Sequence, residues 1–172
     1  GGLPMDVAAL PNGDLVFTGN DQGLGAPTLI LRKDGLTGAT EWMHWYTNGP
    51  GQIMSAQGLV AAADSTILLA GYINDISFYD VFALALSSTD GTPLWSTRVG
   101  TDEFDLAEDV AIAPNGDYLL SGRMLQDTTL GPPMGGFVVR LNANGQRLWS
   151  RHVDHPDAAL FQPVRCSVAS DG

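Results

Sequence analysis

The sequence contains very little cysteine and lysine. Cys166 is the only cysteine among 172 residues, which excludes an internal disulfide and a zinc site built from cysteines. Lys33 is the only lysine, and 8 basic residues stand against 19 acidic ones, for a net charge of -11. Because such a surface repels a phosphate backbone, the composition excludes nucleic acid as a partner.

Long apolar runs and helical periodicity are also missing. No stretch approaches the roughly 20 apolar residues that a membrane-spanning helix needs, so no membrane span is predicted. Apolar residues come instead in short runs rich in Val, Ile, Leu and aromatic residues, bounded by turn sequences such as PNG, TDG and NANG. The sequence therefore predicts an all-β protein of short strands.

A motif of the form Gly-x-x-x-Trp occurs three times, as GATEW, GTPLW and GQRLW. Its tryptophans, Trp42, Trp95 and Trp149, recur about every 53 residues, which is the spacing of a structural repeat. Each unit begins with two apolar runs joined by a tight turn, the second of which ends in glycine. A loop of variable length, a third apolar run and the tryptophan run follow. The unit therefore holds four strands.

Repeats of four short strands predict a β-propeller segment, in which small antiparallel sheets pack radially as blades. Residues 1–172 are predicted to be part of one propeller domain, with three full blades at about 5–56, 57–106 and 107–162. The first strand of a fourth blade is predicted at 163–172. Because propellers close with about four to eight blades, we expect the remaining blades to come from a longer chain or from other copies.

The segment from Phe78 to Arg123 resembles a bacterial repeat known as the seven-bladed β-propeller or SBBP repeat, which has the same order of strands, glycine turn, tryptophan and acidic loop. The segments LTGATEW and STDGTPLW are similar to the tryptophan docking motif of pyrroloquinoline-quinone (PQQ) type propellers. This second resemblance implies that Trp42, Trp95 and Trp149 pack between blades. The alternative is that these tryptophans bind a ligand.

Binding residues are predicted in the loops between the second and third strands and between consecutive blades. These loops vary in length and sequence, whereas the turns at the other end stay nearly constant. Asp102, Glu103 and Asp105 form the densest acidic cluster, and calcium is the cofactor that such oxygen ligands suggest. A solvated acidic surface is the alternative. The other ligand-binding candidates are Asp21, Asp75, Tyr79, Asp127, His155 and Asp157.

Catalysis has little support in the sequence, which has no histidine pair at metal-ligand spacing and no Gly-x-Ser-x-Gly elbow. No catalytic residue is predicted, and the chain is expected not to be an enzyme. The favoured function is a non-catalytic scaffold or binding module whose acidic loops bind a protein, a glycan or calcium. The SBBP resemblance implies a bacterial extracellular or cell-surface location, with the periplasm as the alternative. The alternative function is part of a PQQ-type or other propeller enzyme.

Overall fold

Three antiparallel sheets of four strands make up the computed structural model, which describes residues 3–21, 27–74, 79–100, 104–125, 134–153 and 165–169. The first sheet consists of β1 (Leu3–Ala9), β2 (Leu15–Asn20), β3 (Thr28–Lys33) and β4 (Thr40–Tyr46). The second consists of β5 (Ile53–Ala61), β6 (Thr66–Asn74), β7 (Tyr79–Ser87) and β8 (Pro93–Val99). The third consists of β9 (Phe104–Ile112), β10 (Tyr118–Leu125), β11 (Met134–Leu141) and β12 (Arg147–Val153).

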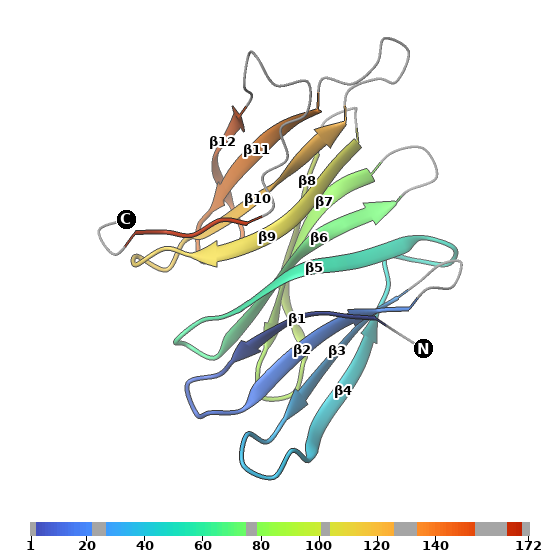
Figure 1. Ribbon diagram of the computed structural model, residues 1–172, viewed down its shortest axis with the longest axis vertical. Coiled ribbons are helices and arrows are strands. Elements are labelled where there is room, and N and C mark those ends of the chain that lie inside the picture. Colours follow the sequence, from blue (N-terminus) through green and yellow to red (C-terminus); the bar gives the residue numbers. More distant parts are fainter. Residues whose placement is uncertain are drawn as a thin grey trace.

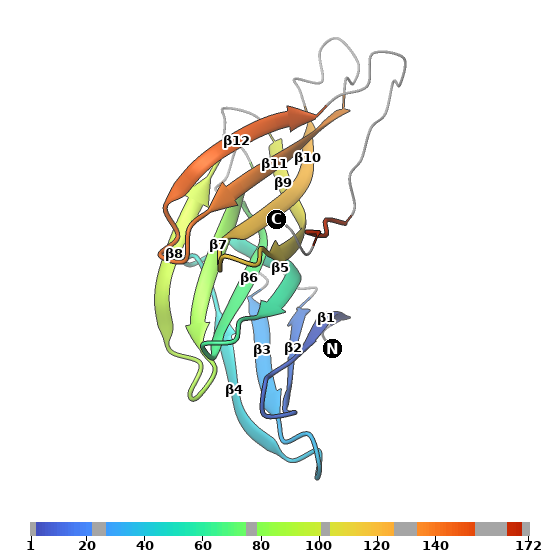
Figure 2. The same cartoon turned by 90° about the vertical axis from the view of Figure 1, so that its left-hand side faces the viewer.

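The sheets follow one another like the blades of a propeller (Figure 1). In each sheet the strands pair in chain order, so the first strand lies at one edge and the fourth at the other. The first strands contact one another, β1 with β5 and β5 with β9. Figure 2 shows the fourth strands along the other side of the stack. The prediction of an all-β, propeller-like fold of four-stranded blades is confirmed. In the ranges that the structure describes, no helix is long and apolar enough to cross a membrane.

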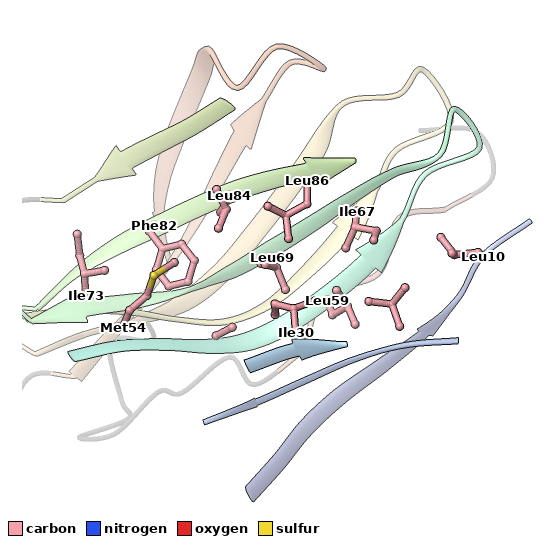
Figure 3. Close-up of a cluster of buried hydrophobic side chains, with 12 residues drawn as sticks. Leu10, Ile30, Met54, Leu59, Ile67, Leu69, Ile73, Phe82, Leu84 and Leu86 are labelled. Carbon is pink, nitrogen blue, oxygen red and sulfur yellow. The ribbon is translucent and has the colours of Figure 1, made fainter. Parts of the chain in front are cut away.

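The hydrophobic core lies between the sheets, in two clusters that share the middle sheet. Figure 3 shows the first cluster, in which Leu69 of β6 points toward Ile30 of the first sheet. Phe82 belongs to this cluster, whereas the adjacent Ala83 belongs to the second cluster with Phe137. Successive side chains of a strand point to opposite faces, so β7 is buried on both sides and is apolar without interruption from Val81 to Leu86.

The first sheet also has a face that no neighbour covers. Val7, Met43 and Trp45 are 50%, 54% and 49% exposed on this sheet. Leu59, at the position of the second sheet that matches Val7, is only 4% exposed because the first sheet covers it. The uncovered face therefore carries the kind of apolar residues that are buried between the other blades.

Residues 165–169 lie beside β9 (Figure 1). The Cys166 amide donates a hydrogen bond of 2.8 Å to the Asp109 carboxylate, and the Leu59 amide donates one of the same length to Asp6. Asp109 and Asp6 hold the same place in their units, in the sequences DVAIAPNGD and DVAALPNGD. Residues 165–169 are thus anchored on the third blade as β5 is anchored on the first.

A bulge recurs where the first and second strands of each sheet pair. The register shifts between Pro4 and Asp6 in β1, between Ala56 and Gly58 in β5, and opposite Gly122 in the third sheet. A glycine of the second strand faces each bulge. A methyl group on Gly71 would lie 2.0 Å from the Ser55 carbonyl oxygen, so the bulge closes only over a residue without a side chain.

We expect the substitution Gly71→Ala to lower the free energy of unfolding by about 1–3 kcal/mol or more. The new methyl group would clash with main-chain atoms of β5, and those atoms can shift only at a cost in stability. Urea unfolding followed by circular dichroism measures the loss. The exposed substitution Leu94→Ala is the control and should change stability by less than about 0.5 kcal/mol. Equal midpoints for Gly71→Ala and the unmodified chain would contradict the close approach at the bulge.

Candidate functional site

Two of the repeated tryptophans join neighbouring blades. Trp42 of β4 donates from Nε1 to the Ser88 carbonyl oxygen at 3.0 Å, and Trp95 of β8 donates to the Ala143 carbonyl oxygen at 3.1 Å. Ser88 and Ala143 each lie in the turn between the third and fourth strands of the next sheet. The indole of one blade therefore closes a contact with the turn of the following blade.

The glycine of the repeated motif receives the tryptophan of the preceding unit. Gly91 and Gly145 adopt positive φ angles of 74° and 78° in these turns. A methyl group on Gly145 would lie 2.4 Å from Trp95 Cε3, and one on Gly91 would lie 2.6 Å from His44 Cδ2 and 3.1 Å from Trp42 Cζ3. The motif Gly-x-x-x-Trp therefore makes contacts on both sides of a blade. Its glycine packs against the indole of the preceding unit, and its tryptophan packs against the turn of the following unit.

Both ends of this series are open in the described chain. Gly38 has the same turn conformation, with φ at 72°, but nothing lies within 4 Å of a methyl group placed on it. Trp149 is half-buried, and the Arg151 guanidinium carbon lies 5.8 Å from its ring centroid. The first glycine and the last tryptophan thus have the geometry of the inner pairs without a neighbouring blade.

Ion pairs between the first turn and the third strand reinforce the first and third blades, and sequence reasoning missed them. Arg32 donates from Nε to Asp14 at 3.0 Å, and Arg140 donates to Asp117 at 2.8 Å. Arg32 also donates from Nη1 at 2.8 Å to the Ser88 carbonyl that Trp42 contacts. A sequence signal for these pairs was available. The two blades that have Asp in the turn PNGD also have Arg in the third strand, and the middle blade has neither residue.

Hydrogen bonds lower the pKa of both turn carboxylates below the usual value of 3.8. The Arg32 side chain is the largest cause at Asp14, and the Asn115 amide is the largest cause at Asp117, ahead of Arg140. A carboxyl group whose pKa is lowered on folding stabilises the fold above its unfolded pKa. That contribution is lost as the pH falls through the lower, folded pKa. The stabilisation by these two carboxylates is therefore fully present at neutral pH.

The structure places three of the predicted loop residues. Asp21 is half-buried, and its amide donates to the Pro27 carbonyl at 3.3 Å. Tyr79 is half-buried and packs edge-on against Tyr72, with ring centroids 5.3 Å apart. Asp105 is only 4% exposed and lines a cavity between the second and third sheets. The predicted site residues outside the described ranges are Asp75, Asp102, Glu103, Asp127, His155 and Asp157.

The described ranges contain no group of three His, Cys, Asp or Glu side chains that could hold a metal ion. An ion pair near Tyr79 was also missed by sequence reasoning. Arg98 donates from Nε to Asp80 at 2.6 Å, and Asp80 is only 7% exposed. The matching positions of Arg98 in the other sheets are Trp45 and His152, so no repeated charge pattern indicated this pair.

The fold has a counterpart among solved structures. A europium-containing methanol dehydrogenase superimposes with a TM-score of 0.53 at 14% sequence identity. The superposition covers 91% of this chain and 27% of the dehydrogenase, so the chain spans about a quarter of that protein's length. No protein-family profile matches the sequence, and no curated protein matches it. At this identity the likeness shows the propeller-like fold alone.

One expectation from the sequence requires correction. The absence of catalytic motifs led to the expectation that the chain is not an enzyme, but the solved structure with which its blades superimpose is a dehydrogenase. The expectation was wrong because the motifs searched for belong to histidine-metal and serine-nucleophile sites. A propeller enzyme need not contain either. Missing motifs therefore do not exclude catalysis by a protein with this fold.

We expect Trp95→Phe to lower the free energy of unfolding by about 0.5–1.5 kcal/mol beyond any packing loss, because phenylalanine cannot donate to the Ala143 carbonyl. Trp149→Phe is the matched control, since no hydrogen bond from its indole occurs among the described residues. Urea unfolding of the 172-residue chain gives both values. Equal losses for the two variants would contradict a specific role for the Trp95 hydrogen bond.

Proposed function

We propose that these blades belong to a ligand-binding propeller. The binding site lies at the loop end of the blades, meaning the end that carries the segments between second and third strands and between consecutive blades. The opposite end, with the turns between first and second and between third and fourth strands, is the turn end. The observation that carries the proposal is the contrast between a uniform turn end and a variable, acidic loop end.

The turn end is built the same way in every blade. The first turns close with main-chain bonds of 2.8 Å from Leu10 to Asp14, Ala62 to Thr66 and Ala113 to Asp117. The second turns close with bonds of 2.9 Å from Asp34 to Ala39, Ser87 to Thr92 and Asn142 to Gln146. Such a scaffold fixes the strands while the loops differ in length and sequence. Variable loops on a rigid frame are where binding residues usually lie.

A hard cation is the ligand that the loop end suits best. The net charge of -11 attracts cations, and oxygen ligands suit calcium and other hard metal ions. The methanol dehydrogenase that superimposes on this chain is named for its europium, also a hard cation. We propose Asp102 and Glu103 as the main ligands. Asp105, the third member of the predicted cluster, is only 4% exposed and is not included in this site. A protein or glycan is the other ligand class for this surface.

Further blades complete the ring in this proposal. The uncovered face of the first sheet and the open turn at Gly38 each match a surface that is covered between inner blades. The missing blades come from a longer polypeptide or from other copies of the chain. The SBBP and PQQ-like resemblances support an extracellular or periplasmic location for such a propeller.

A second candidate function is part of a propeller enzyme of the dehydrogenase type. Its support is the superposition on methanol dehydrogenase together with the tryptophan motif of PQQ-type propellers. A quinone cofactor would contact residues from many blades near the ring axis. We assign no catalytic residue to it, and the described ranges contain no group of three His, Cys, Asp or Glu side chains that could hold a metal ion. Failure of the completed ring to bind the quinone would exclude a PQQ-type enzyme.

We expect the double variant Asp102→Asn with Glu103→Gln to bind Eu³⁺ and Ca²⁺ at least about ten times more weakly than the unmodified chain, because two charged ligands are lost. Europium luminescence and calcium calorimetry measure the affinities. The control variant, Glu41→Gln with Asp64→Asn, removes the same amount of negative charge at two positions that are not at the loop end. Equal weakening by both variants would show unspecific attraction, and flat titrations of the unmodified chain would exclude the cation site.

A further inference from the structure

The first and third sheets present complementary surfaces, and these sheets lie at opposite ends of the stack (Figure 1). The third sheet carries Trp149, at the place that the two blade-joining tryptophans hold in the other sheets. The first sheet carries the turn of Gly38, which has the positive φ angle of the two receiving turns. One end of the chain therefore has the group that the other end has the shape to receive.

The turn of Gly38 is built like a turn that receives a tryptophan. It closes with a main-chain bond of 2.9 Å from the glycine to the residue four places before it, as the turn of Gly91 does. Gly35 therefore holds the place of Ser88, whose carbonyl accepts from Trp42. Ser88 and Gly91 are buried, whereas Gly35 and Gly38 are exposed. The first blade thus leaves open a surface that is covered in the second.

The third blade has a second donor beside its tryptophan. In the first blade, Arg32 donates both to Asp14 of its own turn and to the Ser88 carbonyl of the next blade. Arg140 pairs with the third tryptophan as Arg32 pairs with the first, and it donates to Asp117 at 2.8 Å. A guanidinium has five N–H donors, so Arg140 has donors for the carbonyl of a following blade as well.

Apolar area and charge also match between the two ends. The uncovered face of the first sheet includes Val7 and Trp45, which are 50% and 49% exposed. Glu41 is exposed on the same face of β4 as Trp45, because residues four apart in a strand share a face. At the other end, Arg151 lies beside Trp149. A carboxylate at one end and a guanidinium at the other favour head-to-tail contact over contact between like ends.

We propose that the uncovered face of the first sheet binds the third sheet of a second copy of this chain. Trp149 and Arg140 of one copy donate to the Gly35 carbonyl of the other, and the turn of Gly38 receives the indole. Two copies supply six blades, within the range of about four to eight that close a ring, whereas three copies would supply nine. This inference rests on the proposal that further blades complete the ring, and it names a second copy as their source.

Residues 165–169 oppose this association. The Cys166 amide donates to Asp109 as the Leu59 amide donates to Asp6, so the segment lies where β1 of the second copy has to lie. β1 pairs with β2 at six positions, whereas residues 165–169 form no strand. The segment is therefore the part that leaves. Because this step reduces the population that can associate, the contact is weak and dilute solutions contain single copies.

Sedimentation equilibrium of the full 172-residue chain tests the proposal at chain concentrations from about 10 µM to about 1 mM. Salt at about 0.15 M screens the repulsion between copies of net charge -11. We expect the mass to rise from 18.2 kDa toward twice that value. Trp149→Ala should weaken the association at least about tenfold. Leu94→Ala, which shortens an exposed side chain of the middle blade, is the control and should leave it unchanged.

A mixture of two variants tests the direction of the contact. Gly38→Ala fills the receiving turn and Trp149→Ala removes the indole, so each variant alone lacks both junctions of the ring. The mixture keeps one junction, from Trp149 of the first variant to Gly38 of the second. We expect the mixture to associate at least about ten times more tightly than either variant alone. Circular dichroism checks that both variants are folded.

Three results would overturn the proposal: a mass that stays at 18.2 kDa, a mass that grows beyond two copies, or equal association of the mixture and the single variants. Cys166→Pro removes the amide that holds residues 165–169 and should tighten the association. Unchanged or weaker association of this variant would contradict the role of that segment. A single copy that binds calcium would reject this inference alone, and a dimer that gives flat metal titrations would reject the cation site alone.

Discussion

The contact of one blade's tryptophan with the next blade's glycine turn organises this structure. It joins the fourth strand of one sheet to the turn before the fourth strand of the following sheet, at the edge away from the first strands. The first strands meet at the other edge, where the Asp6 carboxylate of the first unit accepts from the Leu59 amide of the second and β5 contacts β9. Each blade is therefore held at both edges, and its apolar faces are pressed together between them.

This arrangement explains where the molecule can vary. The turn end is fixed by the indole contacts, by Arg32 on the Ser88 carbonyl and by closely similar main-chain bonds. Among the described residues these contacts all lie at the turn end, and the sequences that differ in length and charge lie at the loop end. The interior also varies without loss of the fold, since a thioether at Met54 becomes a carboxylate at Asp105 while the surrounding strands keep their pairing. The proposed cation site lies where the repeat tolerates change.

Local sequence patterns predicted much of the fold. Short apolar runs with glycine turns indicated the strands, and the spacing of Trp42, Trp95 and Trp149 indicated the repeat. Features that depend on two blades meeting were not predictable in this way. The burial of Asp105 follows from which sheets face each other. The pairing of Arg98 with Asp80 depends on the register of β7 and β8 within the middle sheet, which short patterns did not show either. The enzyme question was misjudged for a related reason, since a likeness at 14% identity appears in the arrangement of strands and not in short motifs.

The most direct test of the interlocking blades compares Gly145→Ala with Gly38→Ala in the 172-residue chain. Both glycines have positive φ angles, so both variants pay a backbone cost of about 1–2 kcal/mol. Only Gly145 carries an indole, that of Trp95, against its α-carbon. The account predicts that urea unfolding shows a loss for Gly145→Ala that exceeds the loss for Gly38→Ala by at least about 1 kcal/mol. Equal losses would contradict the claim that the glycine of each unit receives the tryptophan of the unit before it.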